Sequence, residues 1–182
     1  MLQQTYFASP FGCIEIKGSE LGITSVKLTK KDTCPSEEVP PELQECVQQL
    51  DEYFQRKRDV FDLKLDFSGA PEFNLAVWQE LLKIPYGHTT SYLASAKALN
   101  NPDSVRAVGQ ANAHNPIAII VPCHRVIGAD GSLTGYGGGL DRKTWLLEHE
   151  EKYWPTDTGF SRMQPHTKHR VAKDDREPRF EF

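Results

Sequence analysis

Apolar and polar side chains alternate along the first part of the chain, which is the pattern of half-buried β-strands. The alternation is clearest at residues 13–17 and 23–28, and the glycines of 18–22 predict a turn between them. We therefore expect residues 1–30 to form strands of a small antiparallel sheet. The following residues, 30–41, are polar and contain prolines, which indicates a loop.

The spacing of the apolar side chains then changes from the strand period to the helical period and back. Between residues 42 and 54 the apolar side chains recur at the helical period, which predicts an amphipathic helix. Residues 61–67 alternate strictly and predict another half-buried strand. Ser68-Gly69-Ala70-Pro71 breaks this pattern. We place a domain boundary there, so that residues 1–70 form an N-terminal α/β domain.

The second half of the chain is mainly helical in its pattern. Residues 73–84 predict an amphipathic helix, and Ser91 can cap a second helix over 92–99. A short connector at 100–103 leads to a third helix over 105–113. Two short helices joined by so short a turn predict a helix-turn-helix.

The third of these helices is expected to be capped by Asp103 or Ser104. It is built of small residues, which let it approach another surface closely but equally let it pack tightly inside a core. The small residues are Ala107, Gly109, Ala111 and Ala113.

The last part of the pattern predicts a buried strand, a hairpin and a final helix. Residues 117–121 are all apolar, and residues 126–133 predict a hairpin around Asp130-Gly131. Residues 140–150 predict the helix that closes a second domain, 71–150. The remaining residues, 151–182, form a polar tail that we expect to be poorly ordered.

Composition places the chain among ordinary intracellular proteins. Of its 182 residues, 38% are apolar, and no window is apolar enough to cross a bilayer. The first residues lack the basic and apolar regions of a signal peptide, so the cytoplasm is the expected location. The four cysteines are widely spaced, which predicts free thiols in a reducing compartment. A zinc site made of Cys13, Cys34 and a distant histidine stays open as an alternative.

The charge balance limits the ways in which the protein can bind nucleic acid. It holds 21 Lys and Arg against 25 Asp and Glu, a net charge of −4. No segment has the basic excess of a protein that binds DNA mainly through its phosphates. Any DNA binding would therefore depend on helix N-termini, backbone amides or insertion into the duplex.

The strongest chemical signal is Pro122-Cys123-His124-Arg125-Val126, directly after the apolar run. A cysteine needs its thiolate form to act as a nucleophile, and a neighbouring base or positive charge favours that form. His124 could supply the base if the chain bends after Pro122, with Glu148 or Glu150 orienting its ring. Arg125 could add positive potential or pair structurally. The alternatives are a buried structural cysteine and a cysteine hydrolase, for which the sequence offers no distinctive oxyanion hole.

This region resembles the O6-alkylguanine-DNA alkyltransferases, or methylated-DNA–protein-cysteine methyltransferases, of the stand-alone bacterial type. The resemblance runs from residue 71 to 150 and is looser in the N-terminal part. Besides the Cys123 motif it rests on Ile84-Pro85-Tyr86-Gly87, Ser91-Tyr92, Arg106-Ala107-Val108-Gly109, Asn115-Pro116, Gly135-Tyr136 through Gly139, and Trp145-Leu146-Leu147-Glu148-His149-Glu150.

The resemblance implies a single-use DNA-repair enzyme. Cys123 would accept a methyl or alkyl group from O6-alkylguanine, and from O4-alkylthymine, in an irreversible displacement. His124 would deprotonate Cys123 through a water molecule, and Glu150 would orient His124. Asn115 would order the loop at the cysteine, and Tyr92 would press on the target phosphate and donate a proton to the leaving base.

The resemblance also implies the fold, the partner and the remaining site residues. The fold would be a ribonuclease-H-like α/β domain followed by a mainly α winged helix-turn-helix domain. The protein would be a monomer that binds double-stranded DNA through the minor groove, with no cofactor and no metal. Arg106 would take the place of the flipped base, beside Ala107, Gly109 and Ala113, and the pocket would be lined by Val121, Tyr136 and Gly138. The rivals are an alkyltransferase-like protein that only binds the lesion, which Cys123 argues against, and a thiol hydrolase.

Overall fold

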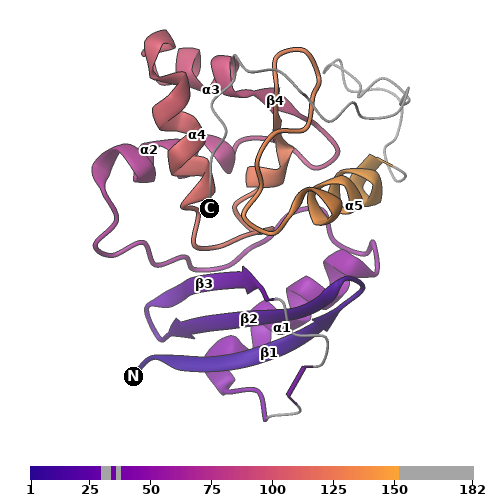
Figure 1. Cartoon of the computed structure of the whole chain (residues 1–182). Coiled ribbons are helices and arrows are strands. Elements are labelled where there is room, and N and C mark those ends of the chain that lie inside the picture. Colours follow the sequence, from indigo (N-terminus) through magenta and orange to yellow (C-terminus); the bar gives the residue numbers. More distant parts are fainter. Residues whose placement is uncertain (30–33, 36–37, 152–182) are drawn as a thin grey trace. The chain divides into compact units, whose positions relative to one another are not determined.

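The computed structural model describes residues 1–29, 34–35 and 38–151 (Figure 1). The expected tail, 151–182, lies outside the described residues except for its first position. The chain separates into two compact units. The first holds Met1–Gly69 together with Pro116–Ile120, and the second holds Ala70–Asn115 and the residues from Val121 onward.

The first unit is built on a three-stranded antiparallel sheet with the order β1-β2-β3. Its strands are β1 (Gln3–Ser9), β2 (Gly12–Ser19) and β3 (Gly22–Leu28). Helix α1 (Pro41–Phe54) packs against the sheet (Figure 1). The predicted strands and helix are therefore confirmed. The core follows from their two periods, because the alternating side chains of the strands meet the apolar stripe of α1. Its buried residues include Ile14, Ile16, Val26, Leu43 and Leu50.

Two further segments of the first unit touch the sheet at single points, although we expected both to be strands. Leu65 and Ile117 each form one parallel bridge to β3, at Ile23 and Val26 respectively. The bridge at Val26 has two backbone hydrogen bonds, of 2.9 and 3.0 Å. The strand predictions for 61–67 and 117–121 are thus wrong in extent. The apolar pattern of each segment indicates contact with the core, but it does not show how many residues pair.

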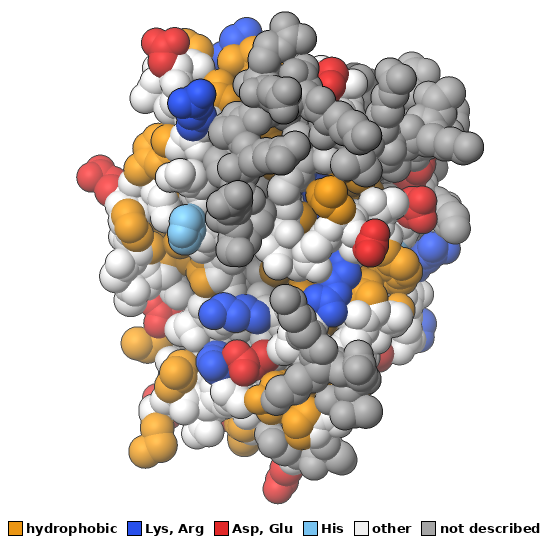
Figure 2. All heavy atoms as spheres, in the orientation of Figure 1, with side chains coloured by type: hydrophobic (Ala, Val, Ile, Leu, Met, Phe, Trp, Pro, Cys, Tyr) orange, Lys and Arg blue, Asp and Glu red, His pale blue; other side chains and the backbone are white. Residues whose placement is uncertain are grey.

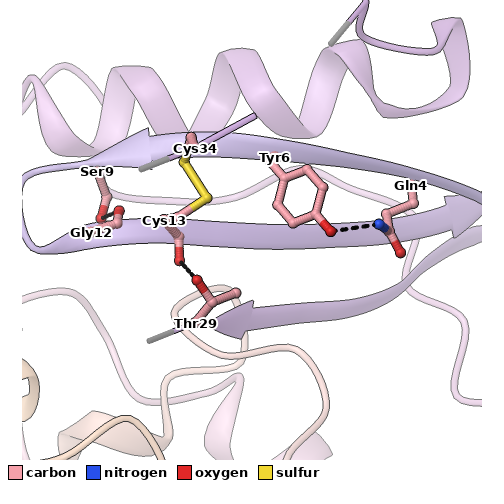
Figure 3. The surroundings of a disulfide bond; sticks show 7 residues. All are labelled: Gln4, Tyr6, Ser9, Gly12, Cys13, Thr29 and Cys34. Carbon is pink, nitrogen blue, oxygen red and sulfur yellow. Dashed lines mark hydrogen bonds between the residues drawn. A yellow bond between two sulfur atoms is a disulfide. The ribbon is translucent and has the colours of Figure 1, made fainter. Parts of the chain in front are cut away.

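The prediction that all four cysteines are free thiols is also wrong. Cys13 on β2 is joined to Cys34 by a disulfide, with their Cα atoms 5.2 Å apart (Figure 3). The main-chain N–H and the hydroxyl of Thr29 both donate to the Cys13 carbonyl, at 2.9 and 2.8 Å. These bonds hold the chain that leaves β3 beside β2. The disulfide also removes both thiolates from the zinc site considered above, whereas Cys46 on α1 is free and buried.

The second unit is mainly helical, as predicted. Its helices are α2 (Glu72–Leu81), α3 (Tyr92–Ala98), α4 (Val105–Ala113) and α5 (Leu140–Glu151), with short 3₁₀ turns η1 (Pro102–Ser104) and η2 (Cys123–Arg125). Helices α2, α3 and α4 pack against one another. The indole N–H of Trp78 donates to the buried carbonyl of Ala111 at 2.8 Å and so fixes α2 to α4.

The helix caps and the turn of this unit agree only in part with the sequence predictions. Ser91 caps α3 as predicted, because its hydroxyl accepts a hydrogen bond from the N–H of Ala94 at 3.0 Å. Ser104 stands at the start of α4 but makes no side-chain cap, and its hydroxyl donates to the carbonyl of Asn101 instead. The expected turn at Asp130-Gly131 is present.

The predicted hairpin around that turn is not formed as expected. Strand β5 (Val126–Ile127) pairs in parallel with β4 (Thr90–Ser91) rather than with the residues that follow the turn. The pairing of β4 with β5 instead joins the start of α3 to the end of η2. Among the described residues, no helix has both the length and the apolar character needed to cross a membrane.

We predict that Gly22→Ala destabilises the protein strongly. Gly22 has a φ of +141°, and a Cβ there would lie 2.7 Å from the carbonyl oxygen of Lys64. Strain and overlap together should lower the free energy of unfolding by about 3 kcal/mol. Gly69→Ala is the matched control, because Gly69 also has a positive φ, +81°, but has nothing within 4 Å of the added Cβ. Denaturant titration of both variants should show a clearly larger loss for Gly22→Ala, and equal losses would contradict the close contact with Lys64.

Candidate active site

Cys123 is buried at the start of η2, where the chain turns sharply. Ile119 has a left-handed backbone with a φ of 74°, and the N–H of Cys123 donates to the carbonyl of Val121 at 2.8 Å. Asn115 supports the same turn, because its side-chain amide donates to the carbonyl of Val121 at 2.8 Å. The bend after Pro122 that the His124 hypothesis requires is therefore present. It replaces the end of the strand that we expected at 117–121.

The residues that follow Cys123 meet the last helix in a buried cluster. Nε2 of His124 lies 2.8 Å from Oε1 of Glu150, and both side chains are fully buried. Arg125 donates to both oxygens of the same carboxylate, from Nε at 2.9 Å and from Nη2 at 3.0 Å. Its Nη1 donates to the carbonyl of Ile84 at 2.6 Å. Glu148, the other acid that we considered, is exposed on α5.

These contacts decide the charge states of the cluster. Burial by itself would raise the pKa of Glu150, but the neighbouring His124 and Arg125 outweigh it and hold that pKa well below its ordinary value. Burial lowers the pKa of His124 despite the opposing carboxylate, so the ring is neutral near pH 7. A neutral ring that faces a carboxylate through Nε2 carries its proton there. Nδ1 is then the unprotonated nitrogen, and no described residue donates to it.

The sulfur of Cys123 lies among groups with opposing effects. Burial raises the pKa of the thiol, whereas a hydrogen bond from Asn115, the charge of Lys143 and the backbone N–H groups of Cys123 and His124 lower it. Tyr136 interacts with the same sulfur. Burial, and after it the neighbouring Cys123, raise the pKa of the Tyr136 hydroxyl well above its ordinary value. Because burial raises the pKa of the thiol, Cys123 does not ionise by itself at neutral pH. The neighbouring donors and Lys143 favour the thiolate once a base removes the proton.

The other expected pocket residues lie in the same unit. Val121 is fully buried beside the turn, Tyr136 is buried, and Gly138 is partly exposed two residues further on. Tyr92 begins α3 and is 6% exposed, and its ring centroid lies 5.9 Å from Nζ of Lys143.

The face of α4 differs in part from the expected DNA-binding set. Arg106 and Ala107 are exposed at its start, and Ala113 is partly exposed at its end. Gly109 is buried, which does not favour a place on the contact face, and its role there stays a prediction. Its small size fits the alternative reading of the helix, close packing within the unit. The exposed side chain one turn after Arg106 is Gln110, which our sequence analysis missed although the spacing i, i+4 from Arg106 indicates it.

Lys143 was missed as well. It is fully buried on α5, and it stands at helical spacing from Leu146, Leu147 and Glu150, which are all buried. That spacing was the available signal, but a lysine is seldom assigned to a buried face. Within the described part of the chain, no group of three or more His, Cys, Asp or Glu side chains could hold a metal ion.

Comparison with known proteins finds two family models that match this chain. Residues 72–152 match the family model described as "6-O-methylguanine DNA methyltransferase, DNA binding domain", and residues 2–67 match "6-O-methylguanine DNA methyltransferase, ribonuclease-like domain". A methylated-DNA–protein-cysteine methyltransferase of Mycolicibacterium paratuberculosis is 45% identical over 159 residues, covering 85% of this chain and 96% of that protein. One from Methanosarcina acetivorans is 49% identical, covering 79% of this chain and 95% of that protein.

Solved structures are similar over the same length. The O6-methylguanine methyltransferase of Mycobacterium tuberculosis, at 44% identity, superposes with a TM-score of 0.76 over 86% of this chain and 97% of that chain. A structure of Mycobacterium tuberculosis OGT in complex with DNA gives a TM-score of 0.74 at the same identity, over 82% of this chain and 92% of that chain.

We predict that Glu150→Gln lowers stability in a pH-dependent way. The substitution leaves the buried Arg125 without its counter-charge, which should cost about 3 kcal/mol of unfolding free energy at pH 7. Because the folded pKa of Glu150 is depressed, its contribution is complete above the unfolded value near 4.3 and is lost as the pH falls below it. The difference from the parent protein should therefore shrink between pH 5 and pH 3. Denaturant titrations should show no such trend for the exposed control Glu148→Gln, and a difference that stays constant with pH would contradict the depressed pKa.

Proposed function

The chain belongs to the 6-O-methylguanine DNA methyltransferase family, and we propose that Cys123 is the residue to which it transfers alkyl groups from damaged DNA. The protein repairs O6-alkylguanine, and O4-alkylthymine as a second substrate, by taking the alkyl group onto itself. The observation that carries the proposal is the buried hydrogen bond between His124 and Glu150, next to Cys123 in η2.

Activation of the cysteine follows from that bond. Glu150 accepts the Nε2 proton of His124, and this leaves Nδ1 free to take a proton. Nδ1 removes the proton of Cys123 through one water molecule. A buried thiol whose pKa is raised needs such a base, because little thiolate forms without one at neutral pH. Asn115 keeps the cysteine in place by holding the turn at Val121.

The transfer itself is a single displacement. The sulfur of Cys123 forms a bond to the alkyl carbon while the bond from that carbon to the guanine O6 breaks. The hydroxyl of Tyr92 supplies a proton to the guanine anion that leaves. The resulting S-alkylcysteine is a stable thioether, and nothing in the site displaces the alkyl group from sulfur, so each protein molecule reacts once. The displacement as written uses neither a cofactor nor a metal.

The DNA is held by the second unit. We propose that α3 and α4, joined through η1, act as a winged helix-turn-helix that binds double-stranded DNA in the minor groove, with Arg106 entering the space of the flipped base. The exposed Ala107 and partly exposed Ala113 permit close approach. Val121, Tyr136 and Gly138 line the pocket for the extruded base. The described side chains visible in Figure 2 include both basic and acidic groups, which suits binding by insertion more than by phosphate attraction.

The architecture of the first unit and the setting of the protein complete the proposal. A three-stranded antiparallel sheet packed against one helix supports a ribonuclease-H-like domain, and the family model that matches residues 2–67 is described as a "ribonuclease-like domain". We place the protein in the cytoplasm as a monomer.

We predict that incubation with duplex DNA containing O6-methylguanine adds one methyl group to the peptide that carries Cys123. Mass spectrometry of a digest should find the adduct there and not on Cys46, whose buried thiol has a pKa raised to about 12. Cys123→Ser should take no methyl group, while the control Cys46→Ser should react like the parent protein. If the methyl group stays in the DNA, the protein is a lesion-binding protein; if ester substrates turn over repeatedly, it is a thiol hydrolase.

We predict that Arg106→Ala impairs repair of duplex DNA more than reaction with free O6-benzylguanine. The duplex must be held open at a cost of a few kcal/mol, whereas the free base needs no such support. The rate on duplex DNA should fall about tenfold or more, and the rate on the free base should change little. Lys83→Ala, an exposed residue of the same unit, serves as the control. Equal losses on both substrates would contradict the insertion of Arg106.

A further inference from the structure

A buried side-chain amide of α4 reaches the main chain of the candidate nucleophile. Nδ2 of Asn112 donates a buried hydrogen bond to the carbonyl oxygen of Cys123 at 3.3 Å. Asn112 is only 5% exposed, and it stands on the buried face of α4, which also carries Val108 and Ala111. Helix α4 therefore holds η2 at the residue whose sulfur is proposed to react.

The other polar atom of the same amide lowers the stability of the fold. Oδ1 of Asn112 is buried, and none of the residues that the structure describes donates a hydrogen bond to it. A buried acceptor without a donor is unfavourable, and one hydrogen bond from Nδ2 offsets this only in part. Leucine has nearly the same shape and would fill the position without an unpaired oxygen. The asparagine is therefore better explained by what its amide holds than by a gain in stability.

The opposite face of α4 is the one that the proposed function directs toward DNA. Arg106, Ala107 and Gln110 are exposed there. On the buried side, the indole N–H of Trp78 donates to the carbonyl of Ala111 at 2.8 Å and fixes the helix to α2. One firmly held helix thus carries the proposed DNA contacts outward and the hydrogen bond to the nucleophile inward.

We propose that Asn112 is a positioning residue for alkyl transfer, which holds the main chain of Cys123 at a fixed place relative to the DNA-binding face of α4. The inference rests on the proposed function of Cys123. The sulfur must meet the alkyl carbon of the extruded base in line with the C–O6 bond that breaks, and a small displacement slows such a reaction strongly. Asn112 acts through the main chain, and it neither gains nor loses a proton.

The test compares two substrates in Asn112→Leu, which keeps the size of the side chain but cannot hold the carbonyl. At saturating DNA, the rate of methyl transfer from duplex DNA containing O6-methylguanine should fall about tenfold or more. Reaction with free O6-benzylguanine should fall about threefold or less, because a free base can follow the cysteine when it moves. Both rates come from the same preparation, so their ratio does not depend on the fraction that is folded. A ratio equal to that of the parent protein would overturn the proposal.

Binding of DNA gives the second readout of the same variant. Asn112 is buried, so the dissociation constant for duplex DNA, measured by fluorescence anisotropy, should stay within about twofold of the parent value. The predicted loss therefore lies in the rate within the complex and not in the affinity. A rate at saturating DNA that equals the parent rate, with the whole loss in affinity, would overturn the proposal.

A matched control separates this effect from the removal of a buried polar atom in general. Thr5 on β1 is fully buried, and its Oγ1 likewise has no hydrogen-bond partner among the described residues. Thr5→Val should leave both rates unchanged. Thermal unfolding of Asn112→Leu should give a midpoint equal to or above that of the parent, because the unpaired oxygen is gone. A lower midpoint with equal losses on both substrates would mean that Asn112 only supports the fold, and would overturn the proposal.

A second variant covers the case in which Asn112→Leu does not fold. Asn112→Ala removes the same hydrogen bond without new methyl groups in the core, and it should lower the same ratio of rates. The parent protein offers an independent check by NMR. The side-chain amide protons of Asn112 should exchange with water much more slowly than those of the exposed Asn101. Equally fast exchange would overturn the proposal.

Failure of this inference is distinguishable from failure of the proposed function. If the parent protein takes no methyl group from DNA, the proposed function is wrong. If the parent protein does take the methyl group and the ratio of rates is unchanged in the Asn112 variants, only the role of Asn112 is wrong.

Discussion

The carboxylate of Glu150 is the group on which the active site depends. It is fully buried and accepts hydrogen bonds from His124, from Arg125 and from the N–H of Gly87. A charged carboxylate that is shielded from water is stable only while these hydrogen-bond donors stay in position. Two of these donors belong to η2 and the third to the loop after α2. Their hydrogen bonds to the Glu150 carboxylate on α5 therefore fix the backbone around Cys123. The same hydrogen bonds therefore hold this part of the second unit together and orient His124, the proposed base.

The position of the cysteine follows from how the chain approaches that carboxylate. Residues 116–120 belong to the first unit, and the chain returns to the second unit at Val121. The left-handed turn at Ile119 and the hydrogen bond from Asn115 to Val121 produce the bend from which η2 starts. A straight strand would have pointed Cys123 and His124 in opposite directions. The irregular backbone therefore matters for the proposed chemistry, because it is what would let Cys123 and His124 take part in one reaction.

Much of the fold could be predicted from periodicity, and the failures have physical causes. The helices that became α1, α2, α3, α4 and α5 were found because each buries one face, and the Ser91 cap was found because its side chain acts locally. Segments 61–67 and 117–121 mislead because an apolar pattern reflects contact with the core and not strand pairing: 61–67 is only partly buried, 117–121 is mostly buried, and each forms one bridge to β3. The Cys13–Cys34 disulfide depends on where a loop returns, which no local pattern contains. In the site, Cys123 and His124 were singled out from the chemistry of the residue types, which left Glu148 and Glu150 as alternatives, and the structure brings His124 and Glu150 together. Lys143 was missed, because its burial contradicts the usual rule for its type.

The central claim is that Glu150 holds His124 as a neutral ring with its proton on Nε2, so that Nδ1 is the base for Cys123. The most direct measurement is ¹⁵N NMR of the His124 imidazole near pH 7 in the unreacted protein, since the shifts and couplings of the two nitrogens identify both tautomer and charge. The account predicts a protonated Nε2 and an unprotonated Nδ1. A proton on Nδ1 instead, or an imidazolium with protons on both nitrogens, would contradict it.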